Sequence, residues 1–359
     1  MRLFSAGAAL TIAIAIAQCA ASPIYTITDL GTLGGPSTTG FAVSSNGQAA
    51  GWGTDALGNT QALIFGGTSP SVFWSNGQAT GINSAGQVSG NVWSGSTQHG
   101  IVWSKGITVD LGANTSAAAI NDAGQVAGSG TQAFLYQNGT TANLGTLAGG
   151  NWSLAEGLSG NGDVAGYGDT PLGIRGFVWT PGGGLEQLFT LGGANSYAMS
   201  VNDAGIVAGS AAIASENLHA ATWQNGTVAD LGTLGGSNSY GYGINNLGTL
   251  VGYSWLASDN ATHAFIAVNG IMVDLNSLLW PQNSGWVVTA AYGINEQGQI
   301  AGEATYNGQS HAVLLNDPPG PPDNSGPAGS SAPEPATWLL AGGALLLGGL
   351  FRSRLSRSR

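Results

Sequence analysis

Cysteine and basic residues are scarce in this sequence. Cys19 is the single cysteine of the 359 residues, and it lies in the apolar N-terminal segment, so the rest of the chain must be held by packing without disulfides. Residues 22–332 contain only Lys105 and Arg175 as basic side chains, against 17 acidic ones, a net charge of −15. Such a body repels nucleic acid and anionic lipid, and we expect no nucleic-acid partner.

The apolar and glycine content excludes a disordered chain. Charged residues make up 7% of the sequence and hydrophobic residues 43%, and there are 61 glycines. Disorder is typical of high net charge with few apolar residues, and apolar residues are plentiful here. Many glycines between short apolar runs indicate short strands joined by tight turns.

The N-terminal segment, residues 1–21, predicts export. A basic start is followed by an apolar run, Leu3–Ala17, and by small residues up to Ala21, as in a secretory signal peptide. A buried N-terminal helix is the alternative. Cleavage is expected after Ala21, and a lipoprotein site at Cys19 fits less well because Gln18 precedes it where a small residue is wanted.

The C-terminal segment combines a short apolar run with a basic tail. Ala336–Phe351 is apolar over 16 residues, four arginines follow it, and residues 317–332 before it form a Pro/Gly/Ser linker. A membrane-spanning helix needs about 20 apolar residues, so this run is marginal as a permanent span. Its arginine tail predicts a cytoplasmic C-terminus. A plain C-terminal anchor remains the alternative to a removable one.

The last 27 residues, 333–359, resemble the PEP-CTERM sorting signal. The order of Pro333, Glu334 and Pro335, a short transmembrane-type helix and an arginine cluster carries the resemblance. It implies an exosortase-type processing enzyme as partner, in a Gram-negative bacterium with an exopolysaccharide system. The protein would be inserted transiently in the inner membrane, cleaved near the Pro-Glu-Pro motif, and then located at the cell surface or outside the cell.

Between these ends the chain is built of repeats. A phrase of the form Ile-Asn-x-x-Gly, followed by a short apolar strand, recurs with a turn glycine at positions 47, 86, 124, 162, 205, 248 and 298. A second phrase, such as HAFIA at 263, follows each copy, and an Asn-Gly pair or a DLGTLGG-like phrase often comes next. Asn-Gly between apolar runs is a strong hairpin signal.

These phrases predict an all-β fold. Four short strands in about 40 residues are typical of a propeller blade, so residues 22–316 predict a seven-bladed β-propeller. The chain begins with a fourth strand and its last repeat stops after a third, so we expect the N-terminal strand to close the ring. An open β-solenoid is the alternative. The repeats over residues 24–316 resemble the HAF-repeat family of bacterial extracellular proteins, named for the phrase at His263, Ala264 and Phe265. That resemblance implies a secreted repeat scaffold and no established chemistry.

The polar residues of the repeats predict structural functions. The four histidines occupy one position of the second phrase, so on separate blades they diverge, and we expect hydrogen bonding and no metal site. They are His99, His219, His263 and His311. The Asp residues of the DLG phrases and the Asn residues of the turns are read as turn formers. DLGTLGG lacks the lysine of a phosphate-binding loop. Neither a nucleophile motif nor a convincing pair of acids is visible, so the sequence predicts no enzyme and no cofactor.

Aromatic residues near the predicted first strands are the candidate binding residues. If those strands line a channel, flat rings at their ends can stack on sugars, although burial as core is the alternative. The candidates are Trp152, Tyr197, Tyr240 and Tyr242, with Trp286 in an insertion at residues 277–286. The expected function is a non-enzymatic cell-surface or biofilm-matrix protein that associates with extracellular polysaccharide. The alternatives are a propeller hydrolase or lyase acting on glycans, and a purely structural surface-layer component.

Overall fold

The computed structural model of the chain describes residues 25–66, 70–282 and 284–316. The predicted signal peptide, linker and sorting signal, residues 1–21, 317–332 and 333–359, lie outside the described residues, and so does the predicted C-terminal helix. Over the described ranges no helix has the length and apolar character needed to cross a membrane.

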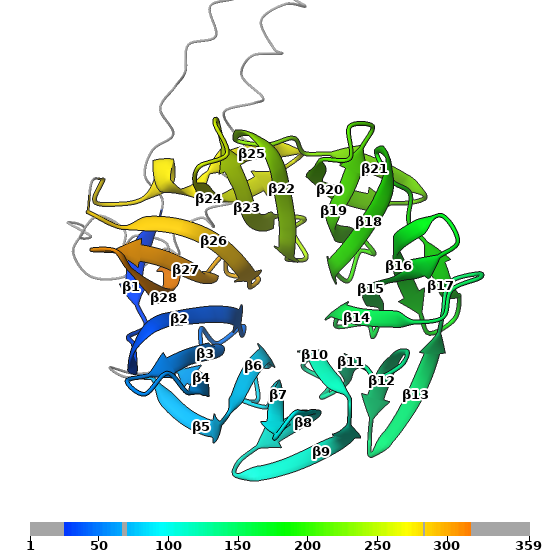
Figure 1. The fold of residues 1–359 in the computed structure, drawn as a ribbon, viewed down its shortest axis with the longest axis horizontal. Coiled ribbons are helices and arrows are strands. Elements are labelled where there is room, and N and C mark those ends of the chain that lie inside the picture. Colours follow the sequence, from blue (N-terminus) through cyan, green and yellow to red (C-terminus); the bar gives the residue numbers. More distant parts are fainter. Residues whose placement is uncertain (1–24, 67–69, 283, 317–359) are drawn as a thin grey trace, which may run out of the picture. The chain divides into compact units, whose positions relative to one another are not determined.

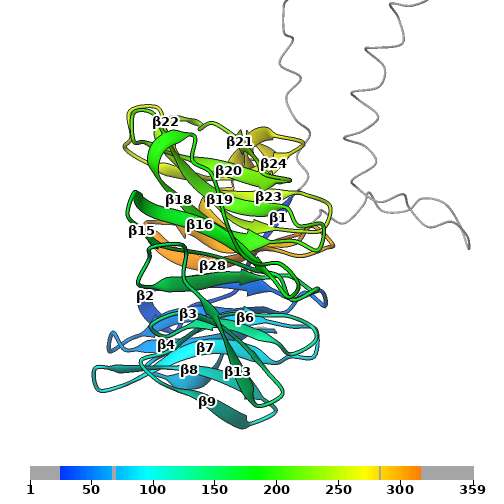
Figure 2. The same ribbon diagram turned by 90° about the vertical axis from the view of Figure 1, so that its right-hand side faces the viewer.

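Seven four-stranded antiparallel sheets form a ring (Figure 1), which Figure 2 shows from the side. The innermost strands are β2 (Gly34–Val43), β6 (Gly77–Ile82), β10 (Ser116–Ile120), β14 (Ser153–Leu158), β18 (Gly192–Val201), β22 (Gly235–Ile244) and β26 (Val287–Ile294). The second strands are β3 (Ala49–Asp55), β7 (Val88–Ser94), β11 (Val126–Ser129), β15 (Val164–Thr170), β19 (Val207–Ile213), β23 (Leu250–Leu256) and β27 (Ile300–Tyr306).

The outer half of each sheet contains the repeated His position and the strand that follows it. The third strands are β4 (Thr60–Phe65), β8 (Thr97–Ser104), β12 (Ala133–Gln137), β16 (Gly173–Thr180), β20 (Leu218–Gln224), β24 (Thr262–Val268) and β28 (Gln309–Asn316). The outermost strands are β5 (Ser71–Ser75), β9 (Ile107–Ala113), β13 (Thr140–Gly145), β17 (Gly184–Gln187), β21 (Thr227–Asp230), β25 (Ile271–Asp274) and β1 (Thr26–Asp29). This architecture confirms the predicted seven-bladed propeller of four-stranded repeats, and the open solenoid is not formed.

Blades 1 to 6 each use four consecutive strands, starting with β2, and blade 7 combines β26, β27 and β28 with β1. β1 is antiparallel to β28, with Thr26 opposite Asn316. The segment between β25 and β26 includes the 3₁₀-helix η1 (Leu275–Leu278), which overlaps the predicted insertion at residues 277–286, and holds the residue before β1. Tyr25 N donates to Leu278 O at 3.0 Å, Trp280 N donates to Tyr25 O at 2.7 Å, and the Tyr25 side chain is buried.

The hydrophobic core lies between the blades. Seven clusters of buried residues each join two neighbouring blades, and small residues of one blade face larger ones of the next. For example, Ala208 and Ala220 of blade 5 pack with Leu250 and Phe265 of blade 6. Close packing at these interfaces requires a small residue after the His position, which explains the repeated His-Ala phrase.

Candidate functional site

A cavity of about 330 Å³ lies at the centre of the ring and is lined by residues from all seven innermost strands. Each innermost strand contributes the residue three positions before the Asn or Ser that opens its turn. These residues are Phe41, Thr80, Ala118, Glu156, Met199, Tyr242 and Tyr292. Ligand sites in proteins are typically cavities that combine apolar walls with a few polar groups, which makes this cavity the candidate site.

A β-bulge in each innermost strand contains the lining residue. In blade 6, Gly241 pairs with Gly252 and Gly243 pairs with Val251, so Tyr242 is the extra, unpaired residue. The same register shift occurs at the equivalent position of the other six blades. Bulges change the direction of a side chain and are common next to functional sites. The seven lining residues therefore face the centre because of one repeated backbone irregularity.

A glycine of the second strand makes each bulge possible. A Cβ on Gly252 would overlap the carbonyl oxygen of Tyr240, two residues before the bulged Tyr242. The equivalent glycines of the other second strands approach the matching carbonyl in the same way; they are Gly51, Gly90, Gly128, Gly166, Gly209 and Gly302. The second-strand glycine of each blade is thus required for close backbone approach at the bulge.

Aromatic residues of blades 4 to 7 and blade 1 form two groups, and within each group the rings contact one another. We call the two groups together the aromatic arc. Tyr167 of β15 contacts Trp152 and Tyr197, with ring centroids 6.2 and 5.2 Å apart. The second group consists of Tyr240, Tyr253, Tyr242, Tyr292 and Phe41, and its neighbouring centroids lie 5.0 to 5.7 Å apart. All eight side chains are half-buried. Rings in this state keep apolar surface available to a ligand.

Glu156 is the one acidic residue among the described residues that line the cavity. Burial raises the pKa of its carboxyl from an ordinary 4.5 to about 7, although a hydrogen bond from Tyr167 partly offsets this effect. Burial and the nearby Glu156 also raise the pKa of the Tyr167 hydroxyl. Because the folded chain keeps the Glu156 proton up to about pH 7 and an unfolded chain releases it near 4.5, this group lowers stability as the pH rises between these values.

The structure brings four of the five predicted aromatic residues together. Trp152, Tyr197, Tyr240 and Tyr242 belong to the aromatic arc, and Tyr242 also lines the cavity. Trp286 does not join them: it stacks on Tyr306 with centroids 4.6 Å apart and meets His311 edge-on. Glu156, Tyr167, Tyr253 and Tyr292 were not among the predicted residues. The sequence contains a signal for Glu156 and Tyr292. The residue three positions before the turn Asn or Ser varies strongly between repeats, and a position that varies in this way is a candidate for ligand contact.

The turn asparagines join each blade to the next. Asn245 Oδ1 accepts from Thr249 N at 3.0 Å within its own turn, and Asn245 Nδ2 donates to Asn295 O of blade 7 at 3.2 Å. Asn83, Asn121, Asn202 and Asn295 make the same bond to the following blade. Blades 1 and 4 have serine at this position, and Asn46 and Asn161, two residues later, reach the next blade instead. These residues shape turns, as predicted, and also form a ring of bonds through all seven blades, the asparagine ring.

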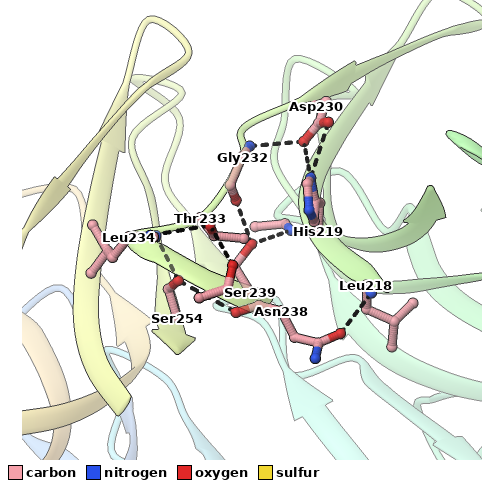
Figure 3. Close-up of polar contacts among 12 residues, drawn as sticks. Leu218, His219, Asp230, Gly232, Thr233, Leu234, Asn238, Ser239 and Ser254 are labelled. Atoms are coloured by element: carbon pink, nitrogen blue, oxygen red, sulfur yellow. Dashed lines mark hydrogen bonds and ion pairs between the residues drawn. The ribbon is translucent and has the colours of Figure 1, made fainter. Parts of the chain in front are cut away.

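The histidines hydrogen-bond within their own blades. His219 Nδ1 lies 2.9 and 3.0 Å from the two carboxylate oxygens of Asp230, and Gly232 N donates to the same carboxylate at 2.8 Å (Figure 3). The equivalent pairs are His99 with Asp110, His263 with Asp274, and His311 with Asp29. One carboxylate thus holds both the third strand and the DLG turn. In the described part of the chain, no group of three or more His, Cys, Asp or Glu is placed to hold a metal ion.

Buried or half-buried hydroxyls at the blade junctions were not predicted. Ser239 Oγ of blade 6 accepts from Ala220 N of blade 5 at 2.7 Å and donates to Gly232 O in the connecting turn at 2.5 Å (Figure 3). Thr115, Ser153 and Ser196 make equivalent bonds at three other junctions. Their spacing from the DLG phrase differs between repeats, so only the fold aligns them.

No family model matches the chain, and no curated protein matches it. Similar solved structures include TolB from Acinetobacter baumannii, with 12% identity, a TM-score of 0.44, and coverage of 62% of this chain and 61% of that one. The extracellular domain of a one-component system from B. thetaiotaomicron has 11% identity and a TM-score of 0.46, with coverage of 81% and 40%. The PQQ-bound aldose sugar dehydrogenase from Streptomyces coelicolor has 11% identity and a TM-score of 0.38, with coverage of 82% and 99%. This chain therefore spans less than two thirds of the first two structures, and the likeness concerns the fold alone.

Proposed function

We propose that this chain is an exported, non-enzymatic cell-surface or biofilm-matrix protein that associates with extracellular polysaccharide. The observation that carries the proposal is the aromatic arc beside the central cavity. Its side chains are only half-buried, and flat aromatic rings suit the apolar faces of sugar rings. Glu156 adds a polar group at the same site, a combination typical of small-molecule and saccharide recognition.

The binding proposal predicts a loss of affinity when the arc is broken. Tyr242→Ala is expected to weaken binding of the full-length protein to exopolysaccharide at least about tenfold, since anchoring aromatic residues dominate such interfaces. Phe189→Ala is the matched control, because Phe189 is 60% exposed and does not line the cavity. Binding is measured by sedimentation with purified polysaccharide. Equal affinity of the wild type and Tyr242→Ala, or no binding by the wild type, would refute the proposal.

Export and sorting form the second part of the proposal, and the two chain ends support it. We expect the mature protein to lack residues 1–21 and to end near Pro333, Glu334 and Pro335, after transient inner-membrane insertion and cleavage by an exosortase-type enzyme. Intact-mass measurement of the protein from native cells and from their medium checks this. A mass that includes the arginine tail, with only the leader missing, would make the protein a permanent membrane-tethered propeller and contradict the sorting interpretation.

Ring closure by the N-terminal strand is the third part. β1 pairs with β28 and is held at Tyr25 by the insertion around η1. We therefore assign the insertion, residues 277–286, an anchoring function for the N-terminal strand. Closure matters for binding because the cavity is lined by both blade 7 and blade 1, through Tyr292 and Phe41.

A glycan hydrolase or lyase is the alternative, and the cavity favours it less. Hydrolysis of glycosides generally requires two carboxyl groups on either side of the bond. Among the described residues that line the cavity, Glu156 has no second acid beside it. A purely structural surface-layer component would have no use for half-buried rings around a cavity, and self-association without any polysaccharide would favour it.

A further inference from the structure

The charges of the propeller are almost all negative. Residues 25–316 contain fifteen acidic side chains and two basic ones. Neither basic side chain lines the cavity: Lys105 lies in the turn between β8 and β9, and Arg175 on β16 donates to Ile174 O at 3.0 Å and to Ala194 O. The summed field of such a propeller attracts cations and repels anionic polysaccharides.

Three neutral polar side chains on the wall formed by blades 2 and 3 already have partners in the protein. Thr80 Oγ1 donates to Ala117 O at 2.8 Å, and Asn91 Oδ1 accepts from Ala117 N at 2.9 Å. Ser129 Oγ accepts from Ala155 N at 2.8 Å. These side chains support the backbone around the bulges, so their hydrogen-bonding capacity toward a ligand is reduced.

Glu156 retains most of its capacity. An ionised carboxylate has about four acceptor sites, and the Tyr167 hydroxyl occupies one of them. On the opposite side of the cavity, Tyr242, Tyr292 and Phe41 line the wall with contacting rings, and their side chains are half-buried. A carboxylate together with aromatic faces in a confined site is the combination that binds ammonium groups, through charge-assisted hydrogen bonds and cation–π attraction.

We propose that the central cavity selects polysaccharides whose sugars carry a free ammonium group, with the cation bound by the Glu156 carboxylate and the aromatic faces of the same cavity. The proposal rests on the polysaccharide association proposed above and names its ligand class. An N-acetylated sugar leaves the carboxylate without a counter-charge, and a uronic acid is repelled by it. Amino-sugar chains with free amines are therefore preferred over both.

The pH dependence follows from Glu156. The titratable groups around it are Tyr167 on β15, with Tyr197 on β18 against Tyr167, and Tyr242 and Tyr292 across the cavity. From the neighbouring β10 and β18, Ser116, Ala118 and Met199 line the cavity and do not titrate. Burial raises the pKa of the Tyr167, Tyr242 and Tyr292 hydroxyls above the ordinary phenol value of about 10, so these three groups are neutral near pH 7. A permanently charged ligand should thus bind more tightly at pH 8, where Glu156 is mainly ionised, than at pH 6, where it is mainly protonated.

Three oligosaccharides of one length and different nitrogen chemistry test the proposal by calorimetry with the full-length protein. The probes are a glucosamine pentamer, its N-acetylated form and its N-trimethylated form, whose charge is independent of pH. At pH 7 the two cationic probes are expected to bind at least about tenfold more tightly than the acetylated one. Trimethylated pentamer should bind several-fold more tightly at pH 8 than at pH 6. Glu156→Gln should remove both effects, whereas Glu186→Gln, on the exposed outermost strand β17, should preserve them.

The outcomes separate the two proposals. Equal or tighter binding of the acetylated pentamer, or a cation preference that persists in Glu156→Gln, overturns the ammonium proposal and leaves polysaccharide association standing. An equal loss of the preference in Glu186→Gln also overturns it, because net charge alone would then explain the effect. If none of the pentamers and no exopolysaccharide binds the wild type, both proposals fail.

Discussion

A chain that lacks residues 25–31 is expected to lose about 4–6 kcal/mol of unfolding free energy, a large part of the total for a typical domain. The deletion removes the buried Tyr25 side chain, its two backbone bonds to the insertion, and the pairing of β1 with β28. It also removes Asp29, the partner of His311. Chemical denaturation of the full-length protein followed by tryptophan fluorescence measures the loss.

A circular permutant is the matched control for this deletion. In it, Asn316 is joined to Ser22 through a short Gly/Ser linker, and the new ends lie between Gly31 and Thr32. β1 then remains beside β28, because Thr26 and Asn316 are already neighbours. The permutant is expected to stay within about 2 kcal/mol of the wild type, since only one covalent connection at the ring surface is cut. Wild-type stability of the deletion variant would contradict closure by β1, and equal instability of the permutant would assign the effect to the β1–β2 connection.

Gly252→Ala is expected to destabilise the protein by about 3–5 kcal/mol, the range of severe core overpacking. The new Cβ would overlap the Tyr240 carbonyl oxygen and lie 2.9 Å from two carbon atoms of the buried Phe265 ring. Neither neighbour can move freely, because Tyr240 O belongs to the innermost strand and Phe265 lies in the core between blades 5 and 6. Relief requires the bulge at Tyr242 to shift, so polysaccharide binding should weaken under conditions where the variant is still folded.

Gly182→Ala is the control for this substitution. A Cβ on Gly182 would have no heavy atom within 4 Å, and the residue does not adopt a positive φ. Alanine there is expected to leave stability unchanged or to raise it by about 0.5–1 kcal/mol, through the lower entropy of the unfolded chain. If Gly252→Ala unfolds within about 1 kcal/mol of Gly182→Ala, the second-strand glycines are not required for the bulges.

The sequence repeats predicted the seven-bladed propeller, but not which residues line its central cavity. Turn asparagines, Asn-Gly pairs and the His position recur because they serve the backbone of every blade, and recurrence makes such features visible in one sequence. Asn138, Asn225 and Asn269, for example, adopt the positive φ of 51–52° that their hairpin turns require. Four of five aromatic candidates fell in the aromatic arc because the order of strands within a repeat indicated which strand is innermost.

The bulges could not be predicted, for a physical reason. Regular alternation along β14 would assign Leu154 and Glu156 to one face, with no sign that the register shifts between Ala155 and Gly157. A bulge depends on the partner strand, where Gly166 allows the close approach, and this pairing is known only after folding. The variable position of Glu156 was visible in the sequence, but the bulge that directs it to the centre was not. Trp286 was included because the insertion lies next to an innermost strand in sequence, although its ring packs with Tyr306 and His311.

The bulges separate recognition from folding. The inter-blade cores, the asparagine ring and the second-strand glycines involve other residues, and the bulged side chain is the extra one that the sheet does not pair. Residues at these seven positions, one per blade, can therefore vary with less effect on the scaffold than core residues, although Thr80 also donates to Ala117 O of the next blade. In this chain the seven bulged residues are Phe41, Thr80, Ala118, Glu156, Met199, Tyr242 and Tyr292. Under the proposed function, propellers with the same repeats and other residues at these seven positions would bind different ligands on the same scaffold.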